Sequence, residues 1–192
     1  MIVLASKSAS RRTMLGAAGV EFETRPAAID ERALEAGLDG AGPGEIALAL
    51  AEAKALSVDG GGKPVLGSDS VVAVAGRRFS KPASRTQAIE HLKFFSGKTM
   101  ELHSAAAIAH NGAIRWRTVA QATLKVRELS DDFIDKYLAV EWPEVSQCVG
   151  VFRIEALGVQ LFERIEGDMF TVLGMPLLAV LGALRELEEL PA

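Results

Sequence analysis

The dipeptide Asn111-Gly112 constrains the fold of this chain more than any other feature of its sequence. It separates two long runs of β-type residues, 99–110 and 113–126. Asn-Gly between two such runs is the strongest short-range signal for a two-residue β-hairpin. The longest strands are therefore expected to be antiparallel, which disfavours a doubly wound Rossmann sheet.

Helical and strand-like segments alternate through the rest of the chain. Helical spacing and capping residues predict helices at 11–18, 45–58, from the Ser84 cap to Phe95, from the Ser130 cap to Leu138, and at 176–190. Short apolar runs predict strands at 2–5, 22–25, 64–66, 71–75, 149–152 and 159–162. Residues 27–44 are expected to form a loop with one helical turn, and Gly76 a turn. Alternating elements around an antiparallel hairpin predict a mixed α/β (α+β) fold.

Composition excludes several classes of protein. The 192 residues are 49% hydrophobic and 24% charged, which is typical of one globular domain spanning residues 1–192. Apolar runs are too short for a membrane helix, and we expect no signal peptide. A net charge of −4 gives no basic footprint for nucleic acid. Cys148 is the only cysteine, so no internal disulfide can form, which fits a reducing cytoplasm.

The segment Ser6–Arg12 lies where a strand is expected to meet a helix. Both common nucleotide fingerprints, the dinucleotide-binding glycine motif and the P-loop, are absent. Hydroxyls, free N–H groups and the guanidinium groups of Arg11 and Arg12 at a helix N-terminus can bind an oxyanion. Cations there oppose the helix dipole unless an anion is bound. A serine cap followed by two solvated arginines explains the segment equally well.

Asp69 lies in Gly67-Ser68-Asp69-Ser70, between two apolar strand-like runs. A buried carboxylate needs N–H groups, a cation or a metal as partners. The small neighbours are expected to leave room for a ligand. An aspartate that caps a turn is the alternative.

Three further polar positions are candidates for binding phosphate or metal. Lys81 precedes Pro82 and is expected in extended geometry, while Lys54 lies on the 45–58 helix. The pair Asp30-Glu31 can supply oxygen ligands to Mg²⁺. Each also has a simpler explanation as a solvated surface charge.

The order of these motifs resembles the Maf family of nucleoside triphosphate pyrophosphatases over essentially the whole chain. Further markers are residues 92–97, Gly167-Asp168 and 172–177. The resemblance implies a bilobed α/β fold similar to inosine triphosphate pyrophosphatases, with a partly antiparallel sheet flanked by helices and the active site in the cleft. It implies hydrolysis of a nucleoside triphosphate to the monophosphate and pyrophosphate, assisted by Mg²⁺ or Mn²⁺, to clear non-standard or modified nucleotides.

The resemblance also implies roles for individual residues. Asp69 matches the proton acceptor and, with Glu31, would hold the metal. Phosphate or substrate binding is expected at Ser8, Arg11, Arg12, Lys54 and Lys81, and base selection at Ser10, Ser70 and Glu155. Glu155 and the 161–167 segment resemble the 7-methyl-GTP branch more than the branch acting on thymidine and uridine triphosphates. Ser70 and Ser10 depart from that branch, which usually has Gln at the first position and often an aromatic residue at the second, so both substrate classes stay open. Two departures, Ala9 for the usual Pro and Ser80 for the usual Gly, remove no charge.

Other functions remain open at this point. The family was named for inhibiting septum formation, so a non-catalytic nucleotide-binding regulator of cell division is the main alternative. A phosphatase releasing orthophosphate is a third. The apolar C-terminal helix can complete the core or form the face of a homodimer.

Overall fold

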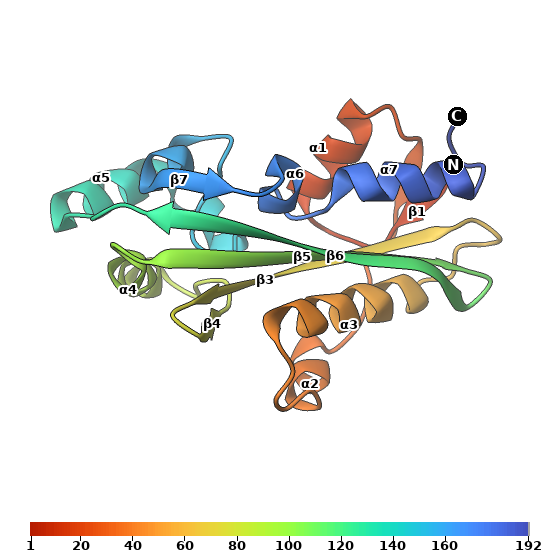
Figure 1. Cartoon of the computed structure of the whole chain (residues 1–192), viewed down its shortest axis with the longest axis horizontal. Helices are drawn as coiled ribbons and strands as arrows, with labels where there is room; N and C mark the ends of the chain where they lie inside the picture. The colour runs from red at the N-terminus through yellow and green to blue at the C-terminus, as the bar shows by residue number, and fades with distance from the viewer. Residues whose placement is uncertain (192) are drawn as a thin grey trace. The chain divides into compact units, whose positions relative to one another are not determined.

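A computed structural model describes residues 1–191 and contains one seven-stranded sheet (Figure 1). The strand order is β2-β1-β3-β5-β6-β7, and β4 pairs with β3. The pairs β1/β2 and β1/β3 are parallel, while β3/β4 and β6/β7 are antiparallel. The strands are β1 (Ile2–Leu4), β2 (Phe22–Thr24), β3 (Val65–Val74), β4 (Arg77–Phe79), β5 (Thr99–His110), β6 (Ala113–Val126) and β7 (Phe162–Glu166). This sheet confirms the mixed α/β class.

Helices connect the strands, and two of those described begin at the capping residues that the sequence predicts. Ser84 Oγ accepts from Gln87 N at 3.2 Å, and Ser130 Oγ accepts from Phe133 N at 3.2 Å. The helices are α1 (Ala9–Ala17), α2 (Glu31–Ala36), α3 (Pro43–Leu56), α4 (Arg85–Phe95), α5 (Asp131–Glu141), α6 (Met169–Val172) and α7 (Leu177–Glu186), with 3₁₀ turns η1 (Glu144–Gln147) and η2 (Leu157–Leu161).

The predicted hairpin between β5 and β6 is confirmed. Asn111 and Gly112 have φ values of 52° and 74°. Positive φ at both central residues is the requirement of a type I′ turn, which matches the twist of the flanking strands.

The chain divides into two compact units. The first unit comprises residues 1–70, 103–120 and 168–192, and the second comprises 71–102 and 121–167. Strands β3, β5 and β6 contribute residues to both. The single bilobed domain over residues 1–192 remains a prediction.

In the first unit, helices cover both faces of the sheet. Helices α1, α6 and α7 lie on one face, and α2 and α3 on the other (Figure 1). The apolar face of α7 packs with α1 and β1 in a core that includes Leu4, Leu15, Ile108, Val180 and Leu184, all fully buried. This core fixes the N-terminal strand–turn–helix segment against the C-terminal helix.

In the second unit, an aromatic cluster joins β4 to α4. Phe79 packs edge-on to His91 and Phe95, with ring centroids 5.0 and 4.7 Å apart. Burial lowers the pKa of His91, and the charge of Arg77 lowers it further. We expect His91 to be neutral and to act as part of the apolar core.

Several predicted element boundaries are wrong. Residues 67–70 do not interrupt the strand, because β3 is continuous from Val65 to Val74, and Arg77–Phe79 forms a strand beyond the predicted turn. No strand forms at 149–152, and 159–162 lies mainly in η2. Helix α7 ends at Glu186 rather than Leu190, since Leu187 already has the non-helical ψ of 7°.

Among the described residues, no helix combines the length and apolar composition needed to cross a bilayer.

Candidate active site

Arg11 is a buried cation held by neutral oxygen atoms. Its side chain lies on α1, and the residue is 9% exposed. Nε donates to Gly174 O at 3.0 Å, Nη2 to Ser70 Oγ at 3.2 Å and Nη1 to Ser6 Oγ at 3.4 Å. No carboxylate among residues 1–191 lies within ion-pair distance of Arg11. Buried charges normally have an ionic partner, so this guanidinium is suited to an external anion.

Burial and the nearby carboxylates act on Arg11 in opposite directions. Burial lowers the pKa of Arg11, and the negative charges of Asp69 and Glu31 partly offset that effect. Arginine nevertheless stays protonated in proteins. Three of its five N–H groups are used by the protein, so donor capacity remains.

Lys54 binds two carboxylates that are far apart in the sequence. Its Nζ atom lies 2.5 Å from Asp69 Oδ1 and 2.8 Å from Glu31 Oε1. The side chains of Lys54 and Asp69 are only 11% and 13% exposed, whereas Glu31 is half exposed. A nearly buried ion pair of this kind is costly to break on one side, because the remaining charge is left unpaired.

Local structure explains why these three residues meet. Asp30 caps α2 by accepting from Ala33 N at 3.0 Å, so Glu31 begins the helix and is free to reach Lys54. Lys54 lies in the last turn of α3. At Gly67, β3 and α3 approach so closely that a Cβ atom would lie 2.1 Å from Ala51 O. The space beside Gly67 is therefore filled by helix α3 rather than left open to a ligand; for the other small neighbours of Asp69 the expectation stays a prediction.

The turn between α6 and α7 connects Arg11 to two of the predicted specificity positions. Gly174 O accepts from Ser70 Oγ at 3.0 Å as well as from Arg11. Ser10 Oγ donates to Leu173 O at 2.8 Å. Gly174 has φ 105°, a conformation that L side chains rarely adopt. A turn of this shape directs its carbonyl oxygens at α1 and β3.

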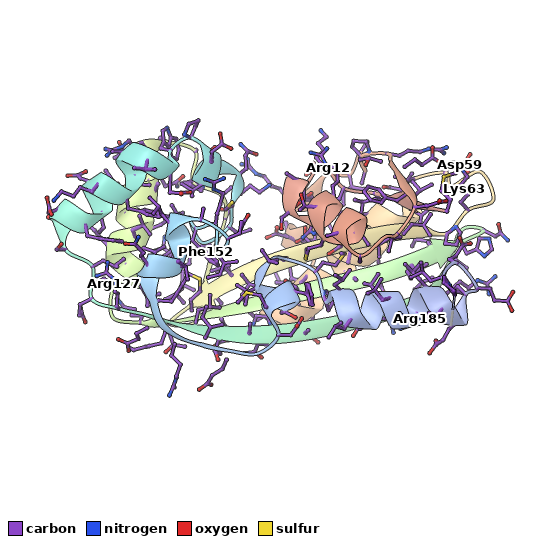
Figure 2. All side chains as sticks on the ribbon, turned by 90° about the horizontal axis from the view of Figure 1, so that it is seen from above. Arg12, Asp59, Lys63, Arg127, Phe152 and Arg185 are labelled. Atoms are coloured by element: carbon purple, nitrogen blue, oxygen red, sulfur yellow. The ribbon has the colours of Figure 1, made fainter. Side chains whose placement is uncertain are left out.

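Ser8 and Arg12 occupy the start of α1. Ser8 is the helix cap, and its Oγ accepts from Arg11 N at 3.4 Å. Arg12 is exposed and points away from the ribbon (Figure 2). The structure thus brings Asp69, Glu31 and Lys54 together, places Arg11 and Ser70 in contact, and leaves Arg12 at the surface.

Lys81 and Glu155 belong to the second unit. Both are exposed: Lys81 follows β4, and Glu155 lies in the loop before η2. Their roles in phosphate binding and base selection remain predictions.

Sequence reasoning missed part of this network. Ser104 Oγ lies 2.9 Å from Ser70 Oγ and donates to Thr171 O, and Ser68 Oγ donates to Ala105 O at 2.7 Å. Local sequence carries no signal for these contacts, because their partners are 34 to 67 positions away. The sequence does carry one signal for the short helix α6. Asp168 lies three residues before Thr171, and its carboxylate caps the helix by accepting from Thr171 N.

Two carboxylates of this cluster could take part in holding a divalent cation. No cluster of three or more His, Cys, Asp or Glu side chains able to hold a metal occurs within residues 1–191. Mg²⁺ typically takes one or two carboxylates and completes its shell with phosphate oxygens and water. Asp69 and Glu31 present two carboxylates that converge on one point, the ammonium group of Lys54.

Comparison with known proteins identifies the family of this chain. The model of the family described as "Maf-like protein" matches residues 1–187. A protein of Rhizobium meliloti named 7-methyl-GTP pyrophosphatase is 47% identical, covering 100% of this chain and 98% of that protein. A protein of Sphingopyxis alaskensis named nucleoside triphosphate pyrophosphatase is 45% identical over 96% of each chain. A solved HAM1 protein of Coxiella burnetii is 19% identical, covering 65% of this chain and 72% of its own, but the TM-score of 0.40 is too low to carry a conclusion. On the family match and these identities, the chain belongs to the Maf-like protein family.

Proposed function

We propose that this chain hydrolyses a nucleoside triphosphate at the α–β bond, releasing the nucleoside monophosphate and pyrophosphate. The observation that supports this most is the buried guanidinium of Arg11, which has neutral partners only among residues 1–191 and lies in the field of the Lys54–Asp69–Glu31 cluster. A polyphosphate would supply the anionic partner that Arg11 lacks. The names of relatives that are 47% and 45% identical point to the same reaction.

The residues of the cluster divide the chemistry between them. Arg11 and Lys54 bind phosphate oxygens and neutralise charge that grows on the leaving pyrophosphate. Ser8 and Arg12, at the start of helix α1, contribute further hydrogen-bond donors. Asp69 accepts a proton from a water molecule as that water attacks the α-phosphorus. The bond from water oxygen to phosphorus forms, the α–β bond breaks, and pyrophosphate leaves with the bonding electron pair.

Asp69 and Glu31 would hold Mg²⁺ or Mn²⁺ when substrate is present. When bound, such a cation screens the negative charge of the phosphates and orients them. Lys54, now paired with both carboxylates, would then be available to a phosphate oxygen.

We assign the substrate to the 7-methyl-GTP class rather than to thymidine or uridine triphosphate. Glu155 and residues 161–167 support this assignment, as does the name of the Rhizobium meliloti relative. A carboxylate at Glu155 can accept N–H groups from a guanine edge, and pairing of this kind discriminates strongly because a wrong base leaves the carboxylate unpaired. The reaction would remove modified nucleotides from the cell. Lys81 would be a further ligand of the substrate phosphates.

One ³¹P NMR experiment separates this function from its alternatives. Purified protein is incubated with Mg²⁺ and, separately, with 7-methyl-GTP, GTP, UTP and dTTP. We expect monophosphate and pyrophosphate, fastest from 7-methyl-GTP. Orthophosphate would instead identify a general phosphatase. Nucleotide binding without turnover would identify a non-catalytic regulator of septum formation.

Two further expectations belong with this proposal. The lone Cys148 supports a cytoplasmic location, which fractionation of expressing cells would test. Leu178 on α7 is 64% exposed, and it would line the face of a homodimer. Light scattering of the purified protein would distinguish a monomer from a dimer.

A further inference from the structure

The loop from Gly150 to Gly158 carries Glu155 and is held at both ends by helix α5. The loop contains no strand and, before η2, no helix. A loop of this length would be mobile if only its own backbone held it. Its contacts with two buried side chains of α5, Tyr137 and Glu141, indicate that its shape is fixed instead.

Tyr137 holds the first part of the loop in a strained conformation. Its hydroxyl donates to Val151 O at 2.9 Å, and the residue is 3% exposed. Val151 is fully buried and has φ 60°, which is a genuine outlier for a β-branched residue. Strain of this kind persists only where the surroundings enforce it, and it clusters at functional sites.

Glu141 holds the second part of the loop on both sides of Glu155. Its carboxylate is 2% exposed. Oε2 accepts from Arg153 Nε at 2.8 Å, and Oε1 accepts from Leu157 N at 3.3 Å. One buried carboxylate therefore binds the residues two positions before and two positions after Glu155.

Packing within the loop removes its remaining freedom. At Gly158, a Cβ atom would lie 2.4 Å from Arg153 O, so the end of the loop packs directly against the backbone of Arg153. Phe152, labelled in Figure 2, packs edge-on against Phe162 of β7, with ring centroids 4.9 Å apart. Glu155 itself is exposed, and it is the loop's one carboxylate.

We propose that Tyr137 and Glu141 are positioning residues for base selection, acting through the Gly150–Gly158 loop on the orientation of Glu155. This inference rests on the proposed function, because it assumes that Glu155 accepts N–H groups of the base. A carboxylate selects a base only if it is held in place, since a mobile acceptor loses its geometric discrimination. Tyr137 and Glu141 do not touch the nucleotide in this scheme.

The test compares kcat/KM for 7-methyl-GTP and UTP in Tyr137→Phe and Glu141→Gln. Tyr137→Phe removes one hydroxyl, and Glu141→Gln keeps the shape of the side chain. We expect the preference for 7-methyl-GTP over UTP to fall about tenfold in each variant, with kcat for UTP retained. Ile134→Val is the matched control: Ile134 is buried on the same helix, and its aliphatic side chain makes no hydrogen bond to the loop, so the melting temperature should fall while the preference stays unchanged.

A double-mutant cycle shows whether the effect passes through Glu155. In a Glu155→Gln background, Tyr137→Phe and Glu141→Gln should leave the remaining preference unchanged within about twofold. Equal loss of activity on both nucleotides would overturn the inference, and so would a shift that persists without Glu155. If the Glu141→Gln protein does not fold, the inference is tested by the substrate preference of Tyr137→Phe with and without Glu155→Gln. An active wild type with an unchanged preference in the variants refutes this inference only, whereas a wild type that releases no pyrophosphate refutes the proposed function as well.

Discussion

Gly67 offers the sharpest test of how the fold builds the cluster around Asp69. A Cβ atom at this position would lie 2.1 Å from Ala51 O, 2.5 Å from Ala55 N and 3.0 Å from Ala55 Cβ. Two of these atoms belong to the backbone of α3, so no side-chain rotation can relieve the overlap. Gly67→Ala must therefore push α3 away from β3.

The expected cost follows from overpacking. Inserting one methyl group into a well-packed contact typically costs about 1–3 kcal/mol, and contact with backbone places this case at about 3 kcal/mol. For a chain of this size, about 2–4 °C of melting temperature is lost per kcal/mol, which gives a decrease of about 6–12 °C. Separation of Lys54 from Asp69 should also lower pyrophosphate release by about tenfold or more.

Thermal unfolding followed by circular dichroism measures the decrease in melting temperature, and a coupled pyrophosphate assay measures the loss of activity. Gly182→Ala is the control, because Gly182 lies within α7 and has nothing within 4 Å of an added Cβ atom. That variant should be more stable by about 0.5–1 kcal/mol, as expected for alanine in a helix. A Gly67→Ala protein that melts within one or two degrees of the wild type would refute the close approach of β3 and α3.

Three further predictions concern the proton acceptor, the thiol and a helix cap. Asp69→Asn should reduce pyrophosphate release by about 10²-fold or more, and EDTA should abolish release until Mg²⁺ is restored; wild-type turnover in the variant would remove Asp69 from proton transfer. Burial, followed by the charge of Glu155, raises the pKa of Cys148 from 9.0 to about 11, so its contribution to stability should be complete below pH 9 and lost as the pH rises through 11. Melting curves between pH 8 and 11 should show a smaller decline for Cys148→Ala than for the wild type, and equal declines would contradict the assignment. Ser84→Ala should destabilise the protein by about 1 kcal/mol, or about 2–4 °C, by removing the cap of α4, and an unchanged melting temperature would show that Gln87 N finds another partner.

Short-range signals predicted much of the fold correctly because their physics is local. Asn111-Gly112 makes its turn through its own φ angles, and Ser84 and Ser130 cap helices through N–H groups three residues away. Asp69, Lys54 and Glu31 were chosen from the sequence, and they do lie together. That grouping depended on the order of the motifs, because no one of these residues is distinctive alone.

The errors occur where tertiary contacts override local preference. Gly67 and Ser68 favour a turn in isolation, but the strand continues through them: Val65 and Leu66 pair with β1, Gly67 packs against α3, and Ser68 Oγ donates to Ala105 O of β5. Residues 149–152 have strand-like composition, yet Tyr137 holds Val151 in a conformation that no strand permits. The Gly174 carbonyl that binds Arg11 is 163 positions away, beyond the range of any periodicity.

The discontinuity of the first unit has a consequence for synthesis on the ribosome. Its core includes helix α7, and Arg11 lies 163 positions before Gly174, so Arg11 emerges long before the carbonyl that binds its Nε. The N-terminal helix must wait, with part of its apolar face uncovered, until α7 leaves the exit tunnel and packs against it. A nascent chain that has exposed only the residues up to Gly167 would therefore leave the apolar surface of α1 that α7 covers in contact with water.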